Sequence, residues 1–204
     1  MPKVPTQQRS RERFENLLDC AEQILHTGQQ ADKLSIYEVA DAADLPAQAV
    51  YRLFPSAEAI IHGLVQRYHG KLTELIAEVD LSQCSAWQGA LETSFIAVCD
   101  FYRQYPHAGY LLLGAGVTWE ISVADREIIT LLAEGSVQKM EQLGLIDASD
   151  NLVCHLEITL DIADAVWRQS YHKHDEITPF FQQESIRAAT SYLELYLPRH
   201  RAGC

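Results

Sequence analysis

The sequence has no run of uncharged apolar residues approaching the roughly 18 that a membrane span requires. Its first residues, Met1 to Pro5, lack the apolar core of a secretory signal. Its cysteines have no paired spacing, which argues against a disulfide framework or a zinc site; they are Cys20, Cys84, Cys99, Cys154 and Cys204. We therefore expect a cytoplasmic protein in a reducing compartment, without a membrane partner or a cofactor.

The sequence also lacks alternating apolar and polar residues of the length that would predict β-strands. Apolar residues instead recur at three- and four-residue steps, as they do from Phe14 to Leu25 and from Ile61 to Val79. Gly28 and Asp44 are candidate helix ends, and Pro46, Pro106 and Thr178-Pro179 separate further runs. The pattern predicts an all-α chain of about nine helices, with the later ones near 86–104, 107–118, 122–143, 150–173 and 179–197.

Charge is distributed unevenly along the chain. The formal net charge of −12 counts against simple nucleic-acid binding, but residues 1–13 form a basic arm that contains Arg9, Arg11 and Arg13. A basic arm on an acidic body is typical of a protein that touches DNA at one end only. We expect two domains, an N-terminal one over 1–56 that contains the basic arm and a helical one over 57–204.

Residues 35–56 have the pattern of a helix-turn-helix. Ser35 and Glu38 are spaced as a capping box, which predicts the start of a short helix. Asp44 tolerates a left-handed turn, and Pro46 suits the start of a second helix over about 47–54. Val50 and Phe54 would hold that helix from behind, so its other side can enter a major groove.

The stretch from Ser35 to Ile60 resembles the DNA-binding segment of TetR-type (tetracycline-repressor-like) transcriptional regulators, above all at Val50-Tyr51-Arg52-Leu53-Phe54-Pro55-Ser56. The resemblance covers about residues 10–60 and implies a homodimeric, ligand-responsive repressor. It implies that residues 1–56 form the DNA-binding domain and residues 57–204 the helical domain for ligand binding and dimerisation. It implies that Tyr51 donates to a phosphate and that Gln48 can pair with adenine. The residues expected at DNA are Arg9, Arg11, Arg13, Ser35, Tyr37, Pro46, Ala47, Gln48, Ala49, Tyr51 and Arg52.

Four positions depart from that resemblance. Asp44 replaces the common turn glycine, Pro46 the turn serine, Leu53 a frequent histidine and Ala57 a phosphate-gripping lysine. Across residues 1–54, six Lys or Arg stand against eight Asp or Glu. These departures predict weak DNA binding, an unusual operator or strong salt sensitivity.

The centre of the chain is rich in aromatic residues, which suit a mostly apolar ligand cavity or an ordinary core. We expect a small, mostly apolar effector to wedge among the helices and change the tilt of the helix that starts near Ala57. The two recognition helices of the dimer would then lose the spacing of about 34–36 Å that successive major grooves require. The candidate ligand-binding residues are Leu64, Tyr68, Phe95, Cys99, Tyr102, Trp119, Trp167 and Tyr171.

The last two predicted helices carry small and aromatic residues at helical spacing, which would permit close packing with a symmetry mate. Burial of the same residues within one subunit is the alternative. The candidate interface residues are Leu156, Ala163, Val166, Phe181, Ala188, Ala189, Tyr192 and Tyr196.

Two other functions stay open. One is a TetR-like helical protein without DNA binding, acting through protein partners. The other is a metal-dependent enzyme on a helical bundle, for which Glu157, Asp161 and Asp164 near His155 are the best candidate ligands. The sequence contains no Glu-x-x-His pair, so we expect no enzyme and no metal.

Overall fold

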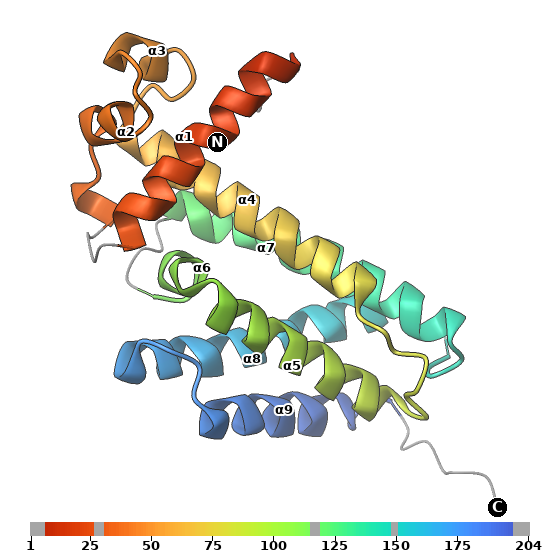
Figure 1. The fold of residues 1–204 in the computed structure, drawn as a ribbon. Helices are drawn as coiled ribbons and strands as arrows, with labels where there is room; N and C mark the ends of the chain where they lie inside the picture. Colours follow the sequence, from red (N-terminus) through yellow and green to blue (C-terminus); the bar gives the residue numbers. More distant parts are fainter. Residues whose placement is uncertain (1–6, 27–30, 115–118, 148–150, 198–204) are drawn as a thin grey trace, which may run out of the picture. The chain divides into compact units, whose positions relative to one another are not determined.

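The computed structural model describes residues 7–26, 31–114, 119–147 and 151–197, with the side chains of Asp32 and residues 119–125 excluded. These residues contain α-helices and one short 3-10 helix, and no strand is found among them (Figure 1). The prediction of an all-α chain is confirmed. The α-helices are α1 Gln8–His26, α2 Ile36–Ala42, α3 Ala47–Tyr51, α4 Ala57–Glu78, α5 Trp87–Gln104, α6 Pro106–Leu112, α7 Trp119–Gln142, α8 Leu152–His174 and α9 Pro179–Leu193.

The chain divides into two compact units, an N-terminal unit Met1–Tyr68 and a C-terminal unit His69–Cys204. The division falls inside α4, rather than at the start of this helix where the sequence analysis put the domain boundary. One helix therefore contributes residues to both units. Among the described residues, no helix has the length and apolar character needed to cross a membrane.

The core of the N-terminal unit is built around the apolar face of α1. Phe14 stacks on Phe54, with ring centroids 4.6 Å apart. Val39 from α2 and Val50 from α3 are fully buried. The apolar positions that recur at helical spacing in the sequence thus face a shared core, and α2 packs on both α1 and α3.

Arg67 near the end of this unit ties α4 to α1. Its Nη2 donates to a side-chain oxygen of Glu15 at 2.7 Å, and its Nη1 donates to Asp19 at 2.8 Å and Glu22 at 3.3 Å. Burial disfavours the charged guanidinium, but the hydrogen bond and charge of Glu15, together with Asp19, raise the pKa of Arg67. The guanidinium is therefore held charged beside carboxylates from three successive turns of α1.

In the C-terminal unit, α8 packs against both α7 and α9, and α9 also packs against α5. Figure 1 shows α8 and α9 running side by side. The indole Nε1 of Trp167 donates to Ser185 Oγ at 2.9 Å across this pair. Two left-handed residues end helices here, Gly144 after α7 (φ 67°) and Asp175 after α8 (φ 57°). The expected helix end at Gly28 lies outside the described residues.

Helix α6 approaches α8 very closely at Gly109. A Cβ atom at this position would lie 1.7 Å from the hydroxyl oxygen of Tyr171. Tyr171 is buried, and burial raises the pKa of its hydroxyl to about 12. The glycine is therefore required for packing against a large, neutral ring.

We expect Gly109→Ala to lower the free energy of unfolding by about 1–3 kcal/mol, because the Tyr171 ring must leave its position. Gly135→Ala on α7 is the matched control, since a Cβ there meets nothing within 4 Å. This control should raise stability by about 0.5–1 kcal/mol through helix propensity. Urea unfolding of both variants checks the pair, and an equally stable Gly109→Ala protein would contradict the packing argument.

Candidate functional site

The start of α2 is fixed by a reciprocal cap. Ser35 Oγ accepts from the backbone amide of Glu38 at 3.2 Å, and the Glu38 carboxylate accepts from the Ser35 amide at 2.9 Å. The capping box predicted from sequence is thus present. A DNA phosphate only accepts hydrogen bonds, so the Ser35 hydroxyl could donate to one while its oxygen still accepts from Glu38.

The turn between α2 and α3 has the geometry expected from sequence. Asp44 has φ 52°, in the left-handed region, and the amide of Leu45 donates to Ala40 O at 2.9 Å. Pro46 precedes α3 in extended conformation. Helix α3 ends at Tyr51, three residues before the predicted end at Phe54. Pro55 disfavours helical backbone at Phe54, and the amides of Leu53 and Phe54 both donate to Val50 O.

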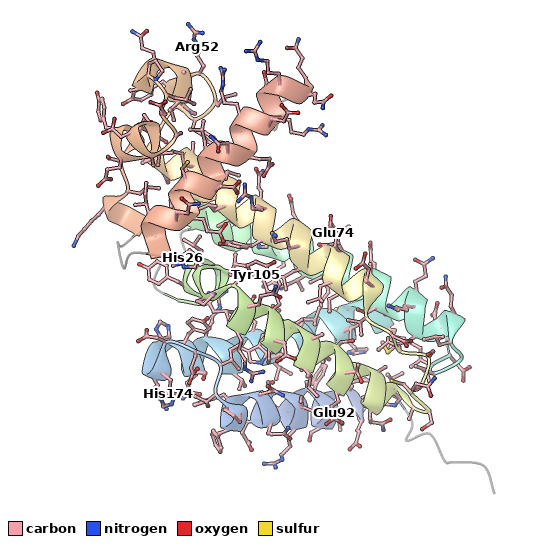
Figure 2. All side chains as sticks on the ribbon, viewed as in Figure 1. His26, Arg52, Glu74, Glu92, Tyr105 and His174 are labelled. Atoms are coloured by element: carbon pink, nitrogen blue, oxygen red, sulfur yellow. The ribbon has the colours of Figure 1, made fainter. Side chains whose placement is uncertain are left out.

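Polar side chains cover the outer side of α3, while Val50 anchors its inner side. Gln48, Tyr51 and Arg52 are exposed, and Figure 2 shows Arg52 directed away from the helices of its unit. Ala47 and Ala49 are half-buried beside them, and Pro46 is exposed. These side chains place hydrogen-bond donors and acceptors at the surface, where packing of the core does not require them.

The nearby residues expected at DNA are also on the surface. Tyr37, at the start of α2, has 65% of its area exposed. Arg9, Arg11 and Arg13 are exposed but lie on α1, which begins at Gln8. The predicted basic arm of residues 1–13 is therefore helical over its second half, and residues 1–6 lie outside the described part.

The C-terminal unit contains a cavity of about 490 Å³. Its walls come from the end of α4, from α5, α6, α7 and α8, and they are mainly aliphatic. Phe95, Tyr102 and Trp167, all expected at a ligand, do line it. The Trp167 and Phe95 rings meet edge to face with centroids 5.3 Å apart.

Four other residues expected at a ligand do not line this cavity. Leu64 and Tyr68 are buried and belong to the N-terminal unit, where the Tyr68 hydroxyl donates to Glu22. Cys99 is fully buried on α5, and Tyr171 packs against α6. Burial raises the pKa of the Cys99 thiol to about 12, so the thiol stays protonated and is a poor nucleophile. The side chain of Trp119 lies outside the described residues.

The charged residues of the cavity wall have internal partners. Lys139 Nζ donates to the carbonyl oxygens of Ala77 at 2.8 Å and Val79 at 2.5 Å, at the end of α4. Arg168 Nε donates to Asp164 Oδ2 at 2.6 Å. Sequence reasoning missed Lys139, because its partners are backbone carbonyls about 60 positions away.

The acidic residues considered as metal ligands on α8 have separate partners. Glu157 accepts from Thr130 Oγ1 at 2.6 Å, Asp161 pairs with Arg126 at 2.8 Å, and Asp164 pairs with Arg168. Their carboxylates therefore bind α7 side chains or their own helix. Within the described part of the chain, no group of three or more His, Cys, Asp or Glu side chains could hold a metal ion.

No protein-family model matches the sequence, and no curated protein sequence matches it. Solved structures do match the fold. A TetR-family transcriptional regulator from Streptomyces coelicolor shares 24% identity, with a TM-score of 0.66, over 90% of this chain and 98% of that one. A putative TetR-family regulator from Mesorhizobium loti has a TM-score of 0.67 at 15% identity, over 93% and 98%.

SmeT, the repressor of the Stenotrophomonas maltophilia multidrug efflux pump SmeDEF, matches with a TM-score of 0.63 at 16% identity, over 92% of this chain and 91% of SmeT. SmeT is also solved in a complex with triclosan. This chain has the TetR-family fold. The resemblance noted in residues 35–60 thus extends, as a fold, over both units.

Within the TetR-family fold, the residues expected at a dimer interface divide into two groups. Leu156, Ala163, Phe181 and Ala189 are buried inside the subunit, so a partner could cover little more of them. Val166, Ala188 and Tyr192 are half-buried, and Tyr196 is 48% exposed and stacks on His155 at 3.6 Å. Sequence reasoning missed the exposed Ile158 and Leu195, which are apolar yet face away from the core.

Asp44 provides a test of the turn geometry in this fold. A left-handed backbone costs a residue with a Cβ about 1–2 kcal/mol, and glycine avoids most of that cost. We therefore expect Asp44→Gly to raise the free energy of unfolding by up to about 1 kcal/mol.

The same substitution at Asp41, an exposed residue inside α2, is the control. Asp41→Gly should lower stability by about 0.5 kcal/mol, because glycine is the poorer helix former. Thermal and urea unfolding measure both changes, and two effects of the same sign would exclude the strained turn.

Proposed function

We propose that this protein is a sequence-specific DNA-binding transcriptional regulator that responds to a small, mostly apolar effector, and that it acts as a repressor. The observation that carries the proposal is the outer face of α3, where Gln48, Tyr51 and Arg52 are exposed on a helix anchored by buried Val50. The TetR-family fold supports it, since the similar SmeT is a repressor. This role requires the protein to work in the compartment that holds the chromosome, which we take to be the cytoplasm.

The proposed reading of DNA follows from the chemistry of this face. Gln48 can donate to and accept from an adenine edge, and the methyls of Ala47 and Ala49 can pack on thymine. Tyr51 and Arg52 can donate to phosphates or nearby bases. The arginines of α1 would add contacts to the phosphate backbone without reading sequence.

The effector would act through α4. Leu72 and Ile76 of this helix line the cavity, and the same helix begins at Ala57, a few residues after α3 ends. A ligand that prefers one position of α4 shifts the population of conformers and so changes the spacing of paired recognition helices. Coupling of this kind is reciprocal, so operator DNA must weaken ligand binding by the same factor.

A homodimer is part of the proposal, because two half-sites require two recognition helices. The exposed apolar residues Ile158, Leu195 and Tyr196 on and after α8 and α9 support a partner surface there. The half-buried Val166, Ala188 and Tyr192 would extend it.

One observation favours a second candidate, a protein of this fold that acts through protein partners without binding DNA. Asp41 and Asp44 are exposed beside the turn, and residues 1–54 carry more acidic than basic side chains. The DNA experiment below separates the two candidates.

We expect Arg52→Ala to weaken binding to the DNA upstream of the protein's own gene by about tenfold, at a cost of 1–3 kcal/mol per contact. If Arg52 binds phosphate, the salt dependence of log K should fall by about one unit of slope. Fluorescence anisotropy over a range of salt concentrations measures both quantities.

Arg187→Ala is the control for net charge, because Arg187 is an exposed arginine of α9 in the other unit. It should leave affinity nearly unchanged. Tyr51→Phe adds a second test, since it removes only the hydroxyl donor. Binding that is insensitive to both α3 variants would favour the candidate without DNA binding.

We expect Ile158→Glu to shift the protein toward the monomer, because a charge would enter the apolar partner surface. Leu143→Glu after α7 is the control, as Leu143 has a similar exposure of 43% and belongs to neither α8 nor α9. Sedimentation velocity at several concentrations distinguishes the species. A wild-type protein that stays monomeric at micromolar concentration would refute the dimer.

A further inference from the structure

We propose that Gly70 is a hinge of α4, at which the helix bends when the DNA-binding residues change their orientation. This inference rests on the proposed function and deepens it, because it names the point at which α4 responds to an effector. Two observations carry it. The attachments of α4 to the two compact units meet around Gly70, and the same turn contains two features that weaken a helix.

Gly70 is an exposed residue inside α4, and packing does not require it. A Cβ at this position would meet no atom of the described residues within 4 Å. Gly63 of the same helix differs, because a Cβ there would lie 2.9 Å from Leu18 Cδ2 and 3.1 Å from Phe54 Cε1. Close packing in the N-terminal core therefore accounts for Gly63, whereas Gly70 needs another explanation.

The attachments of α4 to the N-terminal unit end just before Gly70. Arg67 binds three carboxylates of α1, and the hydroxyl of Tyr68 donates to Glu22 of the same helix. Tyr68 is fully buried and is the last residue of this unit. The part of α4 that precedes Gly70 is therefore held to α1.

The attachments of α4 to the C-terminal unit begin around the same position. His69 and Leu72 are buried and line the cavity. The Lys71 ammonium lies 4.7 Å from the centroid of the Tyr105 ring, within the range of a cation–π interaction. Of residues 68–71, Gly70 is the one that is exposed, and it has no side chain that could attach it to either unit.

The turn around Gly70 is weak as a helix. Glycine is the poorest helix former after proline, because it loses the most conformational freedom on folding. The hydroxyl of Thr73 donates to the carbonyl oxygen of His69 at 2.9 Å, and such bonds to the preceding turn often bend helices. Kinks occur where a side chain enters the backbone hydrogen-bond ladder in this way. Both features lie within residues 69–73.

A bend at Gly70 would be amplified at the DNA-binding end of the helix. From Ala57, the first residue of α4, to Gly70, the helix rises ~20 Å at 1.5 Å per residue. A bend of about 10° therefore displaces the start of α4 by ~3 Å. Helix α3 ends a few residues earlier in the same unit, so paired recognition helices can lose the spacing of about 34–36 Å that DNA requires.

Hydrogen exchange of the full chain, without DNA or ligand, tests the weakness of this turn. We expect Gly70→Ala to slow exchange of the backbone amides of residues 70–74 about fivefold, the factor by which alanine favours a helix over glycine. Gly135→Ala on α7 is the matched control, because a Cβ there also has open space. It should leave exchange at residues 70–74 unchanged. Equal exchange in Gly70→Ala and the wild-type protein would overturn the hinge.

Pulsed electron paramagnetic resonance tests the bend itself, through the spread of distances between the two units. Spin-labelled residues replace Asn16 on α1 and Gln183 on α9, both of which are exposed. An excess of unlabelled chain ensures that any dimer contains one labelled copy. We expect a narrower distance distribution in Gly70→Ala than in the wild-type background, because alanine stiffens the turn.

The double variant Gly70→Ala/Glu74→Gly is the matched control, because it moves the glycine by about one turn. Glu74 is exposed and outside the cavity lining, but it follows Lys71 and Leu72, which attach α4 to the C-terminal unit. The distribution should therefore stay as narrow as in Gly70→Ala. Thermal unfolding confirms that the variants are folded. A distribution as wide as that of the wild type in either folded variant would overturn a hinge at Gly70.

These measurements contain neither DNA nor a ligand, so they separate this inference from the proposed function. A protein that binds promoter DNA but shows no narrowing in Gly70→Ala would refute the hinge and leave the proposed function standing. Narrowing in a protein that binds no promoter DNA would support the hinge and refute the proposed function.

Discussion

The structure depends on α4, which serves both compact units as one helix. In the N-terminal unit, Arg67 binds carboxylates from three turns of α1, which fixes the rotation of α4 about its own axis. In the C-terminal unit, Leu72 and Ile76 of the same helix form part of the cavity wall. Because Lys139 of α7 binds the last carbonyls of α4, this helix is held at its middle and at its C-terminal end by charged hydrogen bonds.

The two attachments of α4 differ in chemistry. Carboxylates accept from Arg67 at the middle of the helix, and backbone carbonyls accept from Lys139 at its C-terminal end. The carbonyl end of a helix attracts cations through the helix dipole, so Lys139 is favourable there even without a carboxylate partner. A molecule in the cavity contacts the part of α4 between these attachments. Lys139 itself lines the cavity, so such a molecule would lie beside the attachment at the C-terminal end of α4.

The sequence predicts best those features that depend on neighbouring residues. Ser35 and Glu38 are three positions apart, and Asp44 precedes Leu45-Pro46, so the cap and the left-handed turn follow from local rules. Apolar spacing indicates that Tyr68 and Tyr171 are buried, but it does not indicate what they contact. Tyr68 binds Glu22 and Tyr171 packs on Gly109, so neither reaches the cavity. The bonds of Arg67 and Lys139 join residues more than 40 positions apart, and no periodicity encodes them.

The acidic residues of the N-terminal unit oppose DNA binding less than their total number suggests. Glu15, Asp19 and Glu22 surround Arg67, Glu12 accepts from the side-chain amide of Gln8, and Glu38 accepts the capping hydrogen bond of Ser35. Five of the eight carboxylates in residues 1–54 thus have cationic or amide partners. Asp41 and Asp44 are exposed close to the turn, where they would repel phosphates. In the proposed complex with DNA, few cations on α1 and beside α3 would offset that repulsion, so phosphate contacts would supply a smaller share of the affinity and base contacts from Gln48 a larger one.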